Sequence, residues 1–226
     1  MSDALYLSLW FPNLRLAELA AKAAAVLGAF AAHGGQARVY AATVWPVSWS
    51  ESPVFQHVYG RGARGAEPAQ AVADAMELLH EDYAYEFQIG WSLWALETMQ
   101  ETALEMMQEP SPSEPGPVRL QPEDAAARWV REERLVRVTA FGPLFDDGAY
   151  QQDGHIRVDF GNDGPLLAEE ADLDQAGAEH VEENVRQLVE LTTVAEKQSG
   201  ATARLLWSEL GESLAERLAA RLSKGN

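Results

Sequence analysis

A short loop rich in glycine and arginine holds the residues whose types and spacing best match a motif with a known mechanism. Residues 60–65 read G-R-G-A-R-G, and the candidate ligand-binding residues are Gly60, Arg61, Gly62, Arg64 and Gly65. Glycine lets the backbone approach a phosphate closely, and arginine binds phosphates and carboxylates through paired hydrogen bonds. Pro68 follows and is favoured in the first turn of a helix, whose N–H groups attract anions. The loop therefore predicts a site for a small phosphorylated or carboxylated ligand.

The details of this loop argue against a dinucleotide-binding fold, although the pattern fits GxGxxG. In that fold the helix begins inside the motif, whereas Pro68 places the helix start after Gly65. Glu67 would also face the pyrophosphate, and Glu86 lies too early in the next predicted strand to bind the ribose. Two interpretations remain: a cradle for a small anion, and a connector whose glycines adopt positive φ.

A second group of polar residues alternates along one predicted strand. His155, Arg157 and Asp159 are separated by apolar residues, so they share one face of that strand. A histidine beside two charged groups is suited to proton transfer, which makes these three residues a candidate polar site. A sheet face that simply meets solvent produces the same alternation, and this interpretation also stays open.

Several other chemistries lack their residues. The chain has no cysteine, which excludes disulfides, thiolate metal sites and cysteine nucleophiles. It contains no P-loop, and Ser92 lacks the second glycine of a GxSxG nucleophile motif. His180 and Glu183 lie one helical turn apart, but no second histidine completes an HExxH motif. We therefore expect no metal and no cofactor, and whether the chain is an enzyme stays open.

The elements that position these residues begin with an alternation of strands and helices over the first 96 residues. Odd-numbered residues from Tyr83 to Leu93 are apolar, which predicts a strand with one buried face. Further strands are predicted near residues 5–9, 39–45 and 54–59. Apolar spacings of three and four residues predict helices at 13–34 and from Pro68 to about His80. This order matches a ferredoxin-like βαββαβ domain at 1–96, in which two helices cover one face of an antiparallel sheet.

The second half is predicted to hold a β-hairpin followed by C-terminal helices, which makes the whole chain an α+β protein. Residues 97–117 are acidic and then rich in proline, serine and glycine, which predicts a linker. Two strands are predicted at 134–141 and 155–160. Helices are predicted at 181–195 and along the leucines at 206, 210, 214, 218 and 222. Residues 118–226 form the second region, either separate from the first domain or packed on it.

The charge of the chain limits its partners. A formal net charge of −18 repels phosphate backbones and anionic lipid headgroups, so neither nucleic acid nor a membrane is an expected partner. No apolar stretch approaches the roughly 20 residues that cross a bilayer, and Asp3 stands where a signal peptide has basic residues. Together with the absence of cysteine, this predicts a cytoplasmic location, and the excess of alanine and arginine suggests a bacterial source.

Two functions follow as hypotheses. The first is a non-catalytic, regulatory module that binds a basic protein through an acidic surface and exposed tryptophans, with Trp45, Trp49, Trp91 and Trp94 as candidates. The alternative is an enzyme or sensor for a small anionic ligand held at residues 60–65.

Overall fold

The fold is built on one antiparallel sheet whose strands are not arranged in sequence order. The computed structural model describes residues 3–33, 37–97, 128–167 and 175–209. Its seven strands are ordered β3-β2-β4-β5-β6-β1-β7, and every neighbouring pair is antiparallel. The strands are β1 (Ala4–Trp10), β2 (Val39–Pro46), β3 (Phe55–Val58), β4 (Tyr83–Glu97), β5 (Arg128–Phe141), β6 (Ile156–Asn162) and β7 (Ala203–Ser208).

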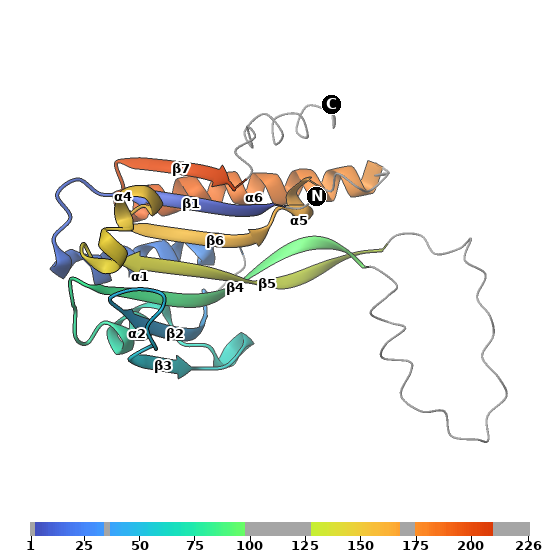
Figure 1. The fold of residues 1–226 in the computed structure, drawn as a ribbon. Helices are drawn as coiled ribbons and strands as arrows, with labels where there is room; N and C mark the ends of the chain where they lie inside the picture. The colour runs from blue at the N-terminus through green and yellow to red at the C-terminus, as the bar shows by residue number, and fades with distance from the viewer. Residues whose placement is uncertain (1–2, 34–36, 98–127, 168–174, 210–226) are drawn as a thin grey trace, which may run out of the picture.

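The three longer helices lie together on one face of this sheet (Figure 1). They are α1 (Leu16–Ala29), α2 (Pro68–Ala75) and α6 (Gln175–Ser199). Shorter helical turns are η1 (Phe30–His33), η2 (Gly62–Arg64), η4 (Phe145–Asp147), α4 (Tyr150–Asp153) and α5 (Gly164–Leu167). Pro68 occupies the first turn of α2 as expected, because its missing N–H has no partner to lose there.

The core lies between the sheet and these helices. Tyr85, Phe87, Ile89, Trp91 and Leu93 all face it and are at most 3% exposed. The period of two in this segment therefore marks a strand with one buried face, as predicted. The opposite face of the sheet carries the even-numbered residues of β4.

The α+β class is confirmed, but the ferredoxin-like order is not. β5 and β6 lie between β4 and β1, so the four early strands do not form a sheet of their own. Strands from both halves of the sequence pair in one sheet, and β5 and β6 form the predicted hairpin. The predicted linker falls almost entirely on residues 98–127, which lie outside the described residues.

The predicted helix along the C-terminal leucines is wrong at its start. Leu206 belongs to β7, where it lies opposite Leu7 of β1, because pairing with the sheet edge satisfies the backbone hydrogen bonds. The remaining leucines of that set lie outside the described residues. No helix in the part of the chain that the structure describes combines the length and apolar composition needed to span a bilayer.

Candidate functional site

The predicted glycine and arginine loop lies between β3 and α2 and folds around Tyr40. Gly60 and Gly62 have φ values of +113° and +60°, so both use the left-handed region that favours glycine. A Cβ atom on Gly65 would lie 2.9 Å from Cδ1 of Tyr40. The N–H of Gly60 donates to the carbonyl of Tyr40. Contact with Tyr40 thus explains why residue 65 is glycine, and no bound ligand is needed for that explanation.

The two arginines of this loop, in contrast to Gly65, are consistent with the predicted ligand site. Arg61 and Arg64 are both exposed, and neither forms an ion pair with a described residue. At the start of α2 the carboxylate of Glu67 forms a 2.5 Å ion pair with Arg38. The loop therefore presents to solvent two guanidinium groups that no described carboxylate pairs with, while the nearby carboxylate of Glu67 is paired with Arg38.

Tyr40 itself was not selected from the sequence, although it organises this region. It is the extra residue of a β-bulge in β2 and is buried. Its hydroxyl donates a hydrogen bond to Glu133 of β5, and burial raises the pKa of Tyr40. A Cβ atom on Gly90 of β4 would lie 2.7 Å from the Tyr40 hydroxyl oxygen. Gly90 therefore makes room for the tyrosine, which is why glycine stands inside a long strand.

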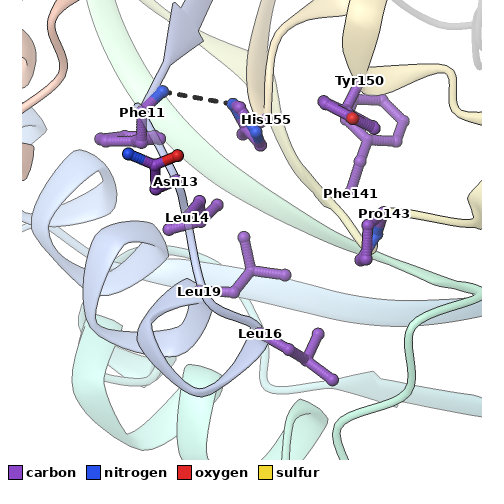
Figure 2. A pocket seen from close by; sticks show the side chains of 9 residues that line it. All are labelled: Phe11, Asn13, Leu14, Leu16, Leu19, Phe141, Pro143, Tyr150 and His155. Atoms are coloured by element: carbon purple, nitrogen blue, oxygen red, sulfur yellow. Dashed lines mark hydrogen bonds between the residues drawn. The ribbon is translucent and has the colours of Figure 1, made fainter.

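The second predicted group is divided among different partners. His155 precedes β6, and its Nδ1 atom accepts a hydrogen bond from the N–H of Phe11 at 3.2 Å. The ring also packs on Tyr150, with centroids 4.7 Å apart. Burial lowers the pKa of His155, which favours the neutral ring. His155 thus belongs to the edge of a pocket between the end of β1 and the loop after β5 (Figure 2).

Arg157 and Asp159 lie on the sheet face opposite the helices, and each pairs with a different residue. Arg157 forms a 2.5 Å ion pair with Asp153. Asp159 forms a 2.5 Å ion pair with Arg137 of β5. The structure therefore does not join His155, Arg157 and Asp159 into one hydrogen-bonded group.

The same face holds Glu86 of β4. The Glu86 carboxyl forms no hydrogen bond with a described residue. Burial raises its pKa, and the charge of Arg137 opposes that shift. Polar residues at alternate positions of β4 and β5 were the available signal, but the register that brings Glu86 near Arg137 could not be read from either strand alone.

One end of the sheet carries an exposed apolar and acidic surface that we call the strand-end patch. The loops that follow β2, precede β4 and follow β5 build it, and they contain no lysine or arginine (residues 47–54, 76–82 and 142–155). Its residues are Val47, Glu81, Asp82, Leu144, Asp146 and Asp147. The side chains of Val47 and Leu144 are 54% and 61% exposed. None of the four carboxylates forms an ion pair with a described residue.

Backbone hydrogen bonds hold the three loops of the strand-end patch together. The N–H of Val47 donates to the carbonyl of Asp82 at 2.7 Å, and the N–H of Asp146 donates to the carbonyl of Val47 at 2.8 Å. The N–H of Leu144 donates to the carbonyl of Glu81 at 2.7 Å. These bonds fix the exposed side chains relative to one another.

The patch also concentrates left-handed backbone. Val47, Asp146 and Asp147 have φ values of +57°, +46° and +54°. Aspartate tolerates this region, whereas a β-branched residue such as valine rarely adopts it. Strain of this kind persists where surrounding contacts enforce it, and it gathers at functional sites.

The tryptophans are less exposed than the first hypothesis requires. Trp45 and Trp49 are half-buried beneath the patch, where Trp49 packs edge-on against Phe145 at 5.0 Å between ring centroids. Trp91 lies in the core. Trp94 packs on His180 at 4.0 Å between ring centroids. The exposed apolar side chains of the patch are therefore aliphatic.

Metal ligation finds no support in the described residues, which contain no group of three histidine, aspartate or glutamate side chains placed to hold an ion. His180 packs against an indole, and Glu183 accepts a 2.8 Å hydrogen bond from the indole N–H of Trp94. Both residues thus serve to attach α6 to β4.

Comparison with known proteins finds no matching family model, no similar curated protein and no similar solved structure. The geometry of the chain itself therefore carries the functional argument.

Proposed function

We propose that this chain is a non-catalytic module of the bacterial cytoplasm that binds a basic protein through the strand-end patch. The observation that carries the proposal is two exposed aliphatic side chains on the same three hydrogen-bonded loops as four carboxylates that lack an ion pair with any described residue. The cytoplasmic location rests on the absence of cysteine, and the bacterial source rests on the excess of alanine and arginine.

The composition of the patch fits a protein interface. Such interfaces bury apolar side chains at their centre and place polar or charged residues at the rim. Val47 and Leu144 are suited to the centre, and Asp146 and Asp147 follow Leu144 closely in the same loop. Isolated exposed aliphatic residues are common on surfaces, but these two lie on hydrogen-bonded neighbouring loops.

The charge of the patch points to a basic partner. Unpaired carboxylates attract lysine and arginine, and the net charge of −18 adds a long-range field of the same sign. Such a field mainly increases the association rate, and salt screens it.

The fixed geometry of the patch lowers the cost of binding. A surface that is ordered before the partner arrives loses little conformational entropy on association. The backbone hydrogen bonds among the three loops supply that order, together with an aromatic cluster in which half-buried Trp49 packs on buried Phe141 and Phe145.

Capture of proteins from a lysate of the source organism tests this proposal. The immobilised chain is compared with Asp146→Asn/Asp147→Asn, which removes two charges and keeps side chains that tolerate positive φ. Glu132→Gln/Glu179→Gln, which removes the same charge from exposed positions outside the patch, is the control.

We expect basic proteins to be retained at about 0.1 M salt and released at about 1 M, where the Debye length falls from roughly 10 to 3 Å. The patch variant should lose them and the control should keep them. Equal capture by the two variants would overturn the proposal.

A second candidate function rests on the exposed Arg61 and Arg64, which form no ion pair with a described residue. A small phosphorylated or carboxylated ligand bound there should raise the melting temperature, because ligands that bind the folded state stabilise it. Inorganic pyrophosphate is the probe, Arg61→Ala/Arg64→Ala the variant and Arg15→Ala/Arg186→Ala the control. A temperature rise that survives in the loop variant, or no rise with the wild-type chain, contradicts this function.

A further inference from the structure

A pocket of about 350 Å³ opens where β1 ends and β6 begins, and it contains none of the six patch residues and none of residues 60–65. It shares the loop at 142–155 with the strand-end patch. Figure 2 shows its two walls facing one another, one from the segment that links β1 to α1 and one from the loop after β5. The volume lies within the roughly 300 to 1,000 Å³ that is usual for small-molecule sites. Six of the nine lining residues are apolar (Phe11, Leu14, Leu16, Leu19, Phe141 and Pro143), but polar atoms contribute about half of the exposed wall.

Three polar groups also line this pocket. They are the side-chain amide of Asn13, the hydroxyl of Tyr150 and the imidazole of His155. The amide, the hydroxyl and Nε2 of His155 have no hydrogen-bond partner among the described residues. Polar groups of this kind, placed among apolar side chains, orient a ligand in a binding site.

The hydrogen bond at Nδ1 determines whether Nε2 of His155 is a hydrogen-bond donor or an acceptor in the pocket. Nδ1 accepts from the N–H of Phe11, so a neutral ring carries its hydrogen on Nε2. Burial lowers the pKa of His155 and favours this neutral form. Nε2 is then a hydrogen-bond donor with a fixed direction, which requires an acceptor on the ligand.

The chain closely constrains the position of His155. Gly154 has a φ of +87°, and a Cβ atom there would lie 2.8 Å from the backbone nitrogen of Leu9. This close approach of β6 to β1 needs glycine and brings the next residue against Phe11. Asn13 has a φ of +53°, which turns the chain at the opposite wall.

None of the described residues that line the pocket has an acidic, lysine or arginine side chain. A charged group on a ligand would lose hydration here without an opposite charge on these residues to compensate, which weakens its binding or shifts its pKa. An uncharged ligand avoids this cost.

We propose that the pocket binds an uncharged small molecule that has an apolar ring or chain and a carbonyl oxygen that accepts a hydrogen bond from Nε2 of His155. This inference does not depend on the protein-binding function, since it uses none of the residues of the strand-end patch.

Three aromatic probes of matched size test the ligand class: acetophenone, isopropylbenzene and benzoate. They share a benzene ring and the same number of non-hydrogen atoms, but only acetophenone combines a carbonyl with zero charge. Titration is followed by ¹H–¹⁵N spectra of the folded chain, which report the amide of Phe11 and the ring nitrogens of His155. We expect acetophenone to shift both signals and isopropylbenzene to bind about five- to tenfold more weakly, the effect of one hydrogen bond.

Benzoate should produce no shift at concentrations where acetophenone does. Equal affinity for acetophenone and isopropylbenzene, binding of benzoate as tight as that of acetophenone, or no shift with any probe would overturn the proposal.

Two variants separate binding in the pocket from binding elsewhere. Leu16→Trp fills the pocket and should abolish the shifts, whereas Val189→Trp on the exposed surface of α6 should leave them unchanged. His155→Phe should bind acetophenone and isopropylbenzene equally well, because the donor is lost and the apolar walls remain. Retention of the acetophenone preference in folded His155→Phe would contradict the role of Nε2.

Discussion

The backbone N–H of Asp146 donates a 2.8 Å hydrogen bond to the carbonyl oxygen of Val47, and both residues have positive φ. This bond joins the loop after β5 to the loop after β2. An L-residue in the left-handed region costs roughly 1–2 kcal/mol, and a β-branched side chain makes the cost larger. Since Val47 is 54% exposed, the free energy gained by burying its side chain offsets little of this backbone strain. The valine thus stays strained while it presents an apolar surface to solvent.

Replacement of Val47 should therefore stabilise the fold. We expect Val47→Asn to raise the free energy of unfolding by about 1 kcal/mol, because asparagine tolerates positive φ. Val54→Asn is the control, since Val54 is 56% exposed and lacks positive φ. Urea unfolding measures both variants. A loss of stability in Val47→Asn would contradict the strain.

Two glycines should respond oppositely to alanine. Gly154→Ala places a Cβ atom 2.8 Å from the backbone nitrogen of Leu9 at a φ of +87°, so we expect a loss of at least about 2 kcal/mol. Gly28→Ala meets nothing within 4 Å inside α1 and should gain about 0.5–1 kcal/mol of helix propensity. Thermal unfolding of the two variants compares them. Similar effects of both substitutions would show that β6 does not approach β1 this closely.

The pH dependence of stability should include a contribution from His155. Burial lowers its pKa in the folded state, so below the reference value of 6.5 the unfolded chain binds more protons. The free energy of unfolding should therefore fall as the pH drops below 6.5, by at most about 1.4 kcal/mol per pH unit for this one group. His155→Gln lacks this group, and urea unfolding from about pH 7.5 to about pH 5.5 gives the difference. If the free energy of unfolding changed equally with pH in both proteins, the pKa of His155 would not be lowered in the folded state.

Two carboxylates on the same sheet face should have opposite effects on stability. Burial raises the pKa of Glu86, so its ionised form disfavours folding above the reference value of 4.5. Glu86→Gln should then be more stable than the wild type near pH 7, and the gain should vanish below about pH 4. Asp159→Asn should lose about 1 kcal/mol, because its carboxylate pairs with Arg137 and accepts a 2.8 Å hydrogen bond from the N–H of Gly161. A destabilised Glu86→Gln would show that attraction to Arg137 outweighs desolvation.

Local periodicity was sufficient to locate most strands and helices. The alternation from Tyr83 to Leu93 marked β4, and Pro68 marked the start of α2, because each signal depends only on neighbouring residues. Strand order depends instead on pairing between distant segments. Nothing in the sequence of β5 or β6 shows that they lie between β4 and β1.

The candidate sites were less predictable than the strands and helices, because they too depend on contacts between distant segments. His155 was selected from its strand pattern, but its contact with Phe11 spans residues far apart in the sequence. The strand-end patch joins Val47, Asp82 and Asp146 through backbone hydrogen bonds between three loops, which no single stretch of sequence reveals. The helix prediction at Leu206 failed for a related reason, since one leucine in a four-residue spacing fits either a helix or an edge strand.

Site-specific photo-crosslinking tests the binding function of the strand-end patch most directly. Because the chain has no cysteine, Leu144→Cys carries one benzophenone label on its thiol, and Val189→Cys, at an exposed position on α6, carries the control label. In a lysate of the source organism, the label at Leu144 should attach to a basic protein, and Asp146→Asn/Asp147→Asn in the same chain should abolish that adduct. The label at Val189 should not capture this protein. The same adducts from both positions, or none from Leu144, would contradict binding through the patch.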